Sequence, residues 1–193
     1  MSASYESFEA LVTELENYRA RTRHSEDLMR RHFRARGYRT IPVGGGFTPG
    51  PDGVFWRTSP KGRTTVVLAD NKAYSAAQVG RASALQQKSL AKNLGRVIAT
   101  AKRRKDTPDA VIRALQGTLD WATGKRAARP TNVKRIVTNA CGRSTNVSPA
   151  LKALGIDFQR VTIPCQRHLK AKRPRRELEL QSELESLETF LEL

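Results

Sequence analysis

Two acids and a lysine flank a predicted β-hairpin at a spacing that suits hydrolytic chemistry. Asp52 precedes the first predicted strand, and Asp70, Asn71 and Lys72 directly follow the second. Because side chains alternate along an extended chain, Asp70 and Lys72 share one face. Mg²⁺ prefers oxygen ligands and is commonly held by one or two carboxylates together with substrate phosphates. A lysine beside such an ion can orient a phosphate oxygen or help deprotonate an attacking water.

The length of the hairpin decides whether the two acids meet. The predicted strands cover residues 53–57 and 64–69, with turn-forming residues between them. If the turn is centred on Pro60-Lys61, the numbers of opposed residues sum to about 121–122, which places Asp52 opposite Ala69 or Asp70. Opposed like charges are destabilising, which favours a cation between them. The alternative is a surface hairpin in which Asp52 caps a turn, since Pro-Asp-Gly is common turn chemistry.

Helices and strands around the hairpin must position these groups. Hydrophobic spacing and turn residues predict two helices within residues 4–36, with a break near Arg21-Thr22-Arg23, Ser25 as the N-cap of the second helix and Gly37 at its end. The further predicted elements are a strand at 38–43, the hairpin, a helix over 75–100 with a strand at 96–99, a helix from Pro108 to about Trp121, a strand at 133–138, a short helix at 148–154 and a strand at 158–163. This order predicts an α/β fold with a mixed central sheet flanked by helices.

Pro51-Asp52 followed by Asp70-Asn71-Lys72 resembles the motif of the PD-(D/E)XK nuclease superfamily. The resemblance covers about residues 22–140 and implies a restriction-endonuclease-like α-β-β-β-α-β core. Members of that superfamily often carry a glutamate on the first core helix, before a Gly-Tyr pair, and Glu26 precedes Gly37-Tyr38 in this way. A glutamate favoured by the dipole of a helix N-terminus is the alternative explanation. The Gln-x-x-x-Tyr pattern of the RecB-like branch is absent after the hairpin.

The resemblance implies metal-dependent phosphodiester hydrolysis, with Mg²⁺ or Mn²⁺ as cofactor. Asp52, Asp70 and the backbone carbonyl of Asn71 would bind the metal. Glu26 would hold a second metal or a metal-bound water, and Lys72 would position the nucleophilic water. In this arrangement the metal stabilises charge that develops on the phosphate.

The chain is strongly basic outside its C-terminal end. Its 193 residues contain 35 Lys and Arg against 18 Asp and Glu, a formal net charge of +17. Residues 177–193 hold six glutamates and no base, so the remainder carries +23. Nucleic acid is the common partner of so basic a protein, and an acidic membrane surface or an acidic protein is the alternative.

Eight of the bases are predicted to contact a nucleic-acid backbone. Four share a helical stripe after the hairpin because they are spaced seven, four and four apart, and four form an exposed run. They are Arg81, Lys88, Lys92 and Arg96 in the stripe and Lys102, Arg103, Arg104 and Lys105 in the run. Such contacts give affinity without sequence specificity. An ordinary solvated helix face is the alternative.

The predicted organisation is a domain over 1–165, a basic linker over 166–176 and an acidic, leucine-bearing helix over 177–193 that contacts the body or a partner protein. Two cysteines are too few for a disulfide scaffold or zinc ribbon, so both thiols are expected to be reduced. Neither a Sec signal peptide nor an apolar run that could span a membrane is recognisable. The expected location is cytoplasmic, with export by a dedicated secretion system as an option.

These features together predict a metal-dependent endonuclease that cuts DNA with low sequence specificity, similar to small bacterial DNase toxin or effector domains or to a defence nuclease. Other catalytic alternatives are a repair, restriction or transposition-linked nuclease and a nuclease of structured RNA. The alternative of another class is a non-catalytic nucleic-acid-binding protein whose acids are structural. Thr138-Asn139-Ala140, which follows a predicted strand, is a further place where polar groups can reach the site.

Overall fold

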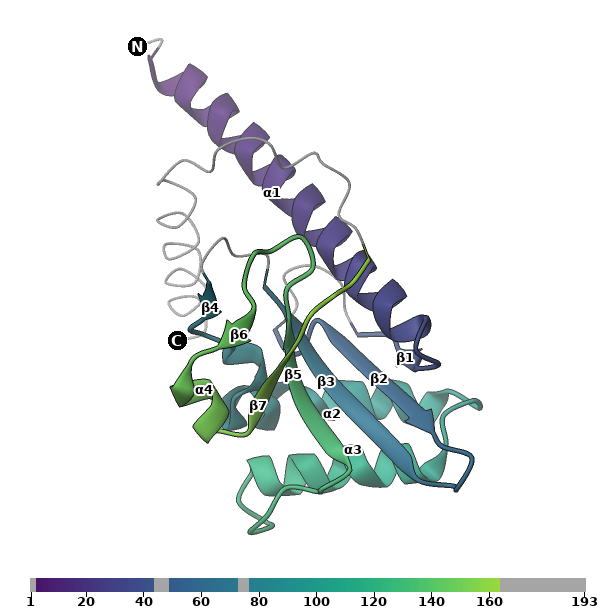
Figure 1. The fold of residues 1–193 in the computed structure, drawn as a ribbon. Coiled ribbons are helices and arrows are strands. Elements are labelled where there is room, and N and C mark those ends of the chain that lie inside the picture. Colours follow the sequence, from purple (N-terminus) through teal and green to yellow (C-terminus); the bar gives the residue numbers. More distant parts are fainter. Residues whose placement is uncertain (1–2, 44–48, 73–76, 164–193) are drawn as a thin grey trace.

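A long helix and three antiparallel strands begin the fold (Figure 1). The computed structural model describes residues 3–43, 49–72 and 77–163. Helix α1 (Ala3–Arg34) is followed by Gly37, whose φ of 77° lets the chain turn into strand β1 (Arg39–Ile41). Strands β2 (Gly53–Thr58) and β3 (Thr64–Asn71) form the predicted hairpin.

Five strands make one mixed sheet in the order β1-β2-β3-β5-β7. Strands β1, β2 and β3 are antiparallel, while β5 and β7 continue parallel to β3. The elements after the hairpin are β4 (Gln78–Val79), the 3₁₀ turn η1 (Ser83–Leu85), α2 (Gln87–Arg103), α3 (Asp109–Ala122), β5 (Val133–Thr138), β6 (Asn146–Val147), α4 (Pro149–Ala153) and β7 (Ile156–Gln159). The short strands β4 and β6 pair separately. The predicted α/β fold with a mixed, helix-flanked sheet is confirmed.

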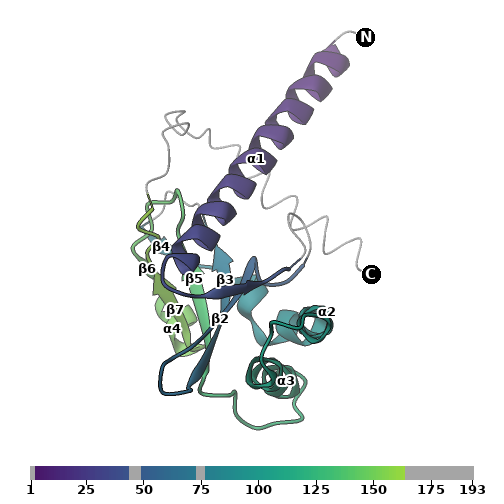
Figure 2. The same cartoon turned by 90° about the vertical axis from the view of Figure 1, so that its right-hand side faces the viewer.

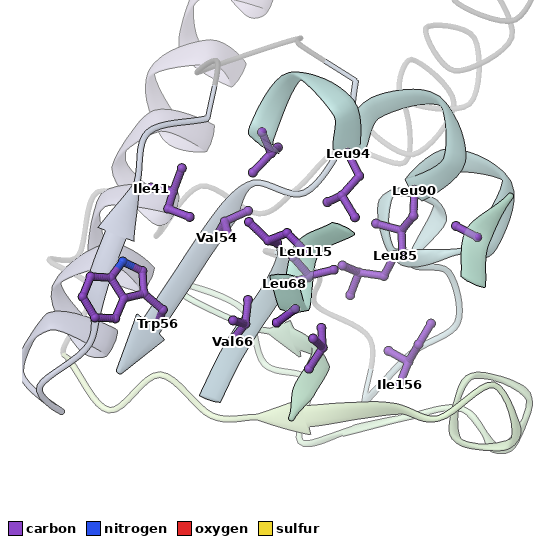
Figure 3. Close-up of a cluster of buried hydrophobic side chains, with 14 of the residues drawn as sticks. Ile41, Val54, Trp56, Val66, Leu68, Leu85, Leu90, Leu94, Leu115 and Ile156 are labelled. Carbon is purple, nitrogen blue, oxygen red and sulfur yellow. The ribbon is translucent and has the colours of Figure 1, made fainter. Parts of the chain in front are cut away.

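Helices cover both faces of the sheet, α1 on one side and α2 with α3 on the other (Figure 2). The larger core lies under α2 and α3, where Leu68 of β3 packs in one cluster with Leu94 and Leu115 (Figure 3). A smaller core lies under α1, where the rings of Phe33 and Phe55 stack with their centres 4.3 Å apart. Alternation along β3 supplies apolar side chains to both layers. The N-terminal part of α1 extends past the sheet (Figure 2).

The predicted break in the first helical region is wrong. Helix α1 is continuous from Ala3 to Arg34, because residues 21–23 include no proline or glycine to interrupt it. Ser25 consequently lies within the helix and does not cap it. Its hydroxyl donates a hydrogen bond to the Thr22 carbonyl at 2.9 Å, which a serine inside a helix can do.

The prediction of one helix over 75–100 ending in a strand is also wrong. Strand β4 and the turn η1 come first, and α2 runs through 96–99 to Arg103. Residues 96–99 are helical and not a strand because apolar side chains recur at helical spacing along α2 and are all buried on one face. They are Leu90, Leu94, Val97 and Ile98. The last strand is also displaced, since β7 covers Ile156–Gln159 and not 158–163.

The hairpin has the predicted register. Gly53 pairs with Ala69, and β3 extends far enough to include Asp70. Gly53 is buried at the start of β2, and a Cβ added there would lie 2.5 Å from the Phe55 ring. The glycine of Pro-Asp-Gly is therefore explained by close packing at the start of a strand.

His32 connects α1 to the last described residues of the chain. Its side chain is fully buried, and its Nδ1 accepts a hydrogen bond from the Thr162 backbone N–H at 3.3 Å. A guanidinium nitrogen of Arg36 lies 2.8 Å from the same Nδ1, and the Gln159 side-chain amide lies 2.9 Å from Nε2. Burial, together with the Arg36 charge, lowers the pKa of His32 to about 4. The fold therefore selects the neutral imidazole.

We expect His32 to make the protein less stable as the pH falls from about 6.5 to 4. In that range the unfolded chain binds a proton that the folded protein excludes, so the free energy of unfolding decreases. The complete shift is worth on the order of 3 kcal/mol. Urea unfolding at several pH values should show a weaker acid dependence for His32→Gln than for the wild type or for His24→Gln, an exposed histidine of the same helix. Identical pH dependence in all three would contradict this expectation.

The remaining sequence predictions concern the cysteines, the segments after residue 165 and membrane-spanning helices. Cys141 is disulfide-bonded, so the expectation of reduced thiols is wrong. A count of cysteines does not reveal whether a fold provides the close spacing that a disulfide needs. The predicted linker 166–176 and helix 177–193 lie outside the described residues. Among the helices of the described residues, none has the length and apolar character needed to cross a membrane.

Candidate active site

Three carboxylates and a lysine gather at one end of the sheet. Asp70 lies near the end of β3, Asp52 directly precedes β2, and Glu26 comes from α1. Glu26 and Asp70 are 5% and 1% exposed, respectively. Burial raises the pKa of both Glu26 and Asp52, and the charge of Asp70 raises both further, while that of Lys72 lowers the pKa of Asp52. The structure thus brings together the four residues predicted to be catalytic.

Asp70 and Lys72 form an ion pair at the end of β3. The Lys72 Nζ lies 3.2 Å from Asp70 Oδ1, as expected for two side chains on one face of a strand. The second carboxylate oxygen, Oδ2, is buried and has no hydrogen-bond partner among the described residues. A buried acceptor without a partner is costly. Asp70 therefore offers one oxygen for which a ligand would compensate the lost hydration.

Asp52 is held beside this pair by the backbone. Its Oδ2 accepts a hydrogen bond from the Asn71 N–H at 2.7 Å. Burial raises the pKa of Asp52 well above its ordinary value, and the Asp70 carboxylate raises it further. Lys72 and the Asn71 N–H act in the opposite direction. Burial and the neighbouring carboxylate thus disfavour the charged form of Asp52, and a cation bound beside it would favour that form.

Glu26 approaches the site from α1 with a cationic partner of its own. Its Oε2 lies 2.8 Å from the Arg30 guanidinium one helical turn away. Burial raises the pKa of Glu26, Arg30 lowers it, and Asp70 makes a smaller raising contribution. Because Glu26 lies deep within α1, the interaction with a helix N-terminus that was considered from the sequence does not apply.

The donor atoms of this site fit a hard divalent ion. Carboxylate oxygens suit Mg²⁺ or Mn²⁺, and Asp70 Oδ2 is a buried carboxylate oxygen without a hydrogen-bond partner in the part of the chain that the structure describes. As it stands, the described part of the chain contains no group of three or more His, Cys, Asp or Glu side chains arranged to hold a metal. Lys72 and Arg30 instead balance the acidic charge. The Asn71 carbonyl stays a predicted ligand.

The predicted stripe of bases is only partly formed. Lys88, Lys92 and Arg96 are exposed on α2, but Arg81 precedes η1 and so does not share their helix. The prediction for Arg81 rested on a helix over 75–100 that the structure replaces with β4 and η1. Arg96 also lines a cavity of about 170 Å³ that includes Pro51, the neighbour of Asp52, so this end of the stripe lies near the candidate site.

The predicted basic run lies at the end of α2. Lys102 and Arg103 belong to its last turn, and Lys105 is exposed beyond it. Arg104 makes a bidentate pair with Asp106 in which the shorter distance is 2.8 Å. Its charge is therefore already balanced locally, and a contact with phosphate would have to compete with Asp106.

The sequence-based prediction missed two residues at the site, Arg30 and Ser25. Arg30 follows Glu26 by four residues, which is the spacing of helical ion pairs and a signal that could have identified it. Ser25 contacts the Asn71 side chain across 46 residues of sequence, and no local pattern indicates such a pair. Thr138 and Ala140 also bind Asn71, so polar groups after the 133–138 strand do reach the site, as considered from the sequence.

Comparisons of the chain with protein-family models, with curated proteins and with solved structures find no match. The geometry described above and the motif in the sequence therefore carry the functional argument. The buried carboxylates are the central fact for that argument, because pKa values shifted by burial and by specific charged neighbours cluster at functional sites.

Proposed function

We propose that the protein is a metal-dependent endonuclease of the PD-(D/E)XK type that hydrolyses phosphodiester bonds of DNA. The observation that carries this proposal is the surroundings of Asp70. This buried carboxylate is paired with Lys72 through one oxygen, has no hydrogen-bond partner for the other within the described parts of the chain, and lies within electrostatic reach of Asp52 and Glu26. Such a cluster costs stability in a metal-free protein, and binding a divalent ion relieves that cost.

In this proposal Asp52 and Asp70 hold Mg²⁺ or Mn²⁺, with the Asn71 carbonyl as a further ligand and Glu26 available to a second ion or a bound water. The bound ion would polarise the scissile phosphate and make water a better nucleophile at neutral pH. The chain contributes the remaining chemistry. The Lys72 ammonium, held by Asp70, donates a hydrogen bond to a phosphate oxygen or to the attacking water.

Charge supports nucleic acid as the substrate. The chain outside residues 177–193 carries a net charge of +23. Lys88, Lys92 and Arg96 are exposed on α2, and Arg96 lines the same cavity as Pro51. Contacts from lysine and arginine to phosphates give affinity that depends on salt and little on sequence. We therefore propose low sequence specificity. A role as an antibacterial toxin, effector or defence nuclease acting in the cytoplasm, and a protein partner for residues 177–193, belong to the same proposal.

Cleavage of supercoiled plasmid DNA tests this function directly. Purified protein should nick and linearise the plasmid with Mg²⁺ or Mn²⁺ and lose all activity in EDTA. Cleavage that persists in EDTA would contradict the metal requirement. Binding of DNA without cleavage at any metal concentration would instead identify a non-catalytic nucleic-acid-binding protein. A parallel reaction with structured RNA distinguishes the two substrates, since cleavage of RNA alone would replace DNA in the proposal.

A further inference from the structure

The side chain of Asn71 joins three elements at the candidate active site, and we propose that it is a positioning residue for the reaction proposed above. Its Nδ2 donates to Ser25 Oγ on α1 at 3.0 Å. Its Oδ1 accepts from Thr138 Oγ1 at the end of β5 and from the Ala140 N–H, both at 2.9 Å. Its backbone N–H binds Asp52. We call Asn71, Ser25, Thr138 and Ala140 the Asn71 clamp.

The partners of this side chain require an amide. The Ser25 hydroxyl hydrogen is directed to the Thr22 carbonyl, so Ser25 Oγ can only accept from Asn71. The Ala140 N–H can only donate, which fixes the amide orientation with Oδ1 toward β5. Residue 71 must therefore donate on one side and accept on the other. Aspartate, which has the same shape, lacks the donor for Ser25.

The clamp connects the two elements that supply the acids. Ser25 immediately precedes Glu26 on α1, and Asn71 immediately follows Asp70 on β3. The apolar packing of α1, through Leu28, Met29 and Phe33, begins about one turn beyond Ser25 toward the helix C-terminus. Apolar contacts are not directional, whereas hydrogen bonds restrict both distance and angle. The clamp therefore sets where Glu26 stands relative to Asp70, and with it the spacing of the oxygens offered to a metal.

A positioning role predicts a change in metal response. Ser25→Ala removes the acceptor on α1, Thr138→Val removes a donor on β5 at nearly constant volume, and Ser25→Thr retains the hydroxyl. We expect the first two variants to raise the Mn²⁺ dissociation constant, measured by titration calorimetry, about tenfold or more, as is usual for residues that orient metal ligands. The Mg²⁺ concentration for half-maximal plasmid cleavage should rise in parallel, while the rate at saturating Mg²⁺ changes less. Ser25→Thr should stay within about twofold of the wild type.

The outcomes separate a positioning role from a purely structural one. Lower melting temperatures for Ser25→Ala and Thr138→Val with an unchanged metal response would overturn the proposal, because the clamp would then only stabilise the fold. Failure of Ser25→Thr to restore the metal response would overturn it as well. Restoration by Ser25→Thr at equal stability supports it, since the hydroxyl is the group that Ser25→Thr shares with the wild type and Ser25→Ala lacks.

Amide hydrogen exchange keeps the test independent of nuclease activity. In the metal-free protein, the amides of α1 around Ser25 should exchange faster in Ser25→Ala and Thr138→Val than in the wild type or Ser25→Thr. If the wild type neither cleaves DNA nor binds Mn²⁺, the proposed function fails and the positioning role fails with it; faster exchange would then show only that these hydrogen bonds hold α1 in place. Unchanged exchange in both variants would overturn the clamp even in an active nuclease.

Discussion

Asp70→Asn is expected to lower the rate of DNA cleavage about a thousandfold or more at saturating Mg²⁺ while leaving the fold intact. The substitution preserves the size of a buried side chain, removes the charge that pairs with Lys72, and removes the carboxylate that we propose as a metal ligand. A bound metal ion contributes several kcal/mol of transition-state stabilisation, and each 1.4 kcal/mol corresponds to about a factor of ten in rate. Plasmid cleavage under single-turnover conditions measures the effect on chemistry alone.

Asp109→Asn provides the matched control for this prediction. Asp109 is exposed at the start of α3 and is far in the sequence from the hairpin. Its replacement by asparagine makes the same chemical change outside the site. The Asp109→Asn protein should cleave at the wild-type rate. Circular dichroism and melting temperature should show that Asp70→Asn is folded. A folded Asp70→Asn protein with more than a tenth of the wild-type rate would refute the role given to Asp70.

The predictable parts of the fold are those that local sequence determines. The hairpin register follows from turn residues and alternation, so Asp52 could be placed opposite Ala69 or Asp70 from the sequence alone. The helix α2 was harder, because Val97 and Ile98 favour strands locally and become helical only through burial against the sheet. Strands β4 and β6 have two residues each and pair across the sequence, which leaves almost no local signal.

The candidate site divides in the same way. The shared face of Asp70 and Lys72 follows from alternation along one strand. Glu26, in contrast, was identified by the resemblance to a nuclease superfamily and not by a spacing rule. The position of Glu26 depends on how α1 lies across the sheet. That depends in turn on contacts such as Ser25 with Asn71, whose partners are far apart in sequence. Tertiary hydrogen bonds of this kind carry no periodicity, so they could not be predicted from the sequence.

Asp52→Asn is expected to stabilise the metal-free protein at high pH while abolishing its response to divalent ions. The pKa of Asp52 is raised well above that of an ordinary aspartate by burial and by Asp70. Between the ordinary pKa and the raised one, the folded protein binds a proton that the unfolded chain has released. The free energy of unfolding of the wild type therefore decreases as the pH rises through this range. Asparagine keeps an oxygen for the Asn71 N–H and carries no charge.

Thermal unfolding in EDTA across a pH series measures this difference. The melting temperature of Asp52→Asn should exceed that of the wild type by a few degrees at high pH, since 1 kcal/mol corresponds to roughly 2–4 °C in a protein of this size. The two proteins should converge at low pH, where Asp52 is protonated in both states. Adding Mg²⁺ or Mn²⁺ should raise the melting temperature of the wild type and of the control Asp27→Asn, whose substituted side chain is exposed. The melting temperature of Asp52→Asn should not respond to either ion. A wild type that gains no stability from either ion, or an Asp52→Asn protein that gains as much, would mean that Asp52 does not bind the metal. Its raised pKa would then reflect burial beside Asp70 alone.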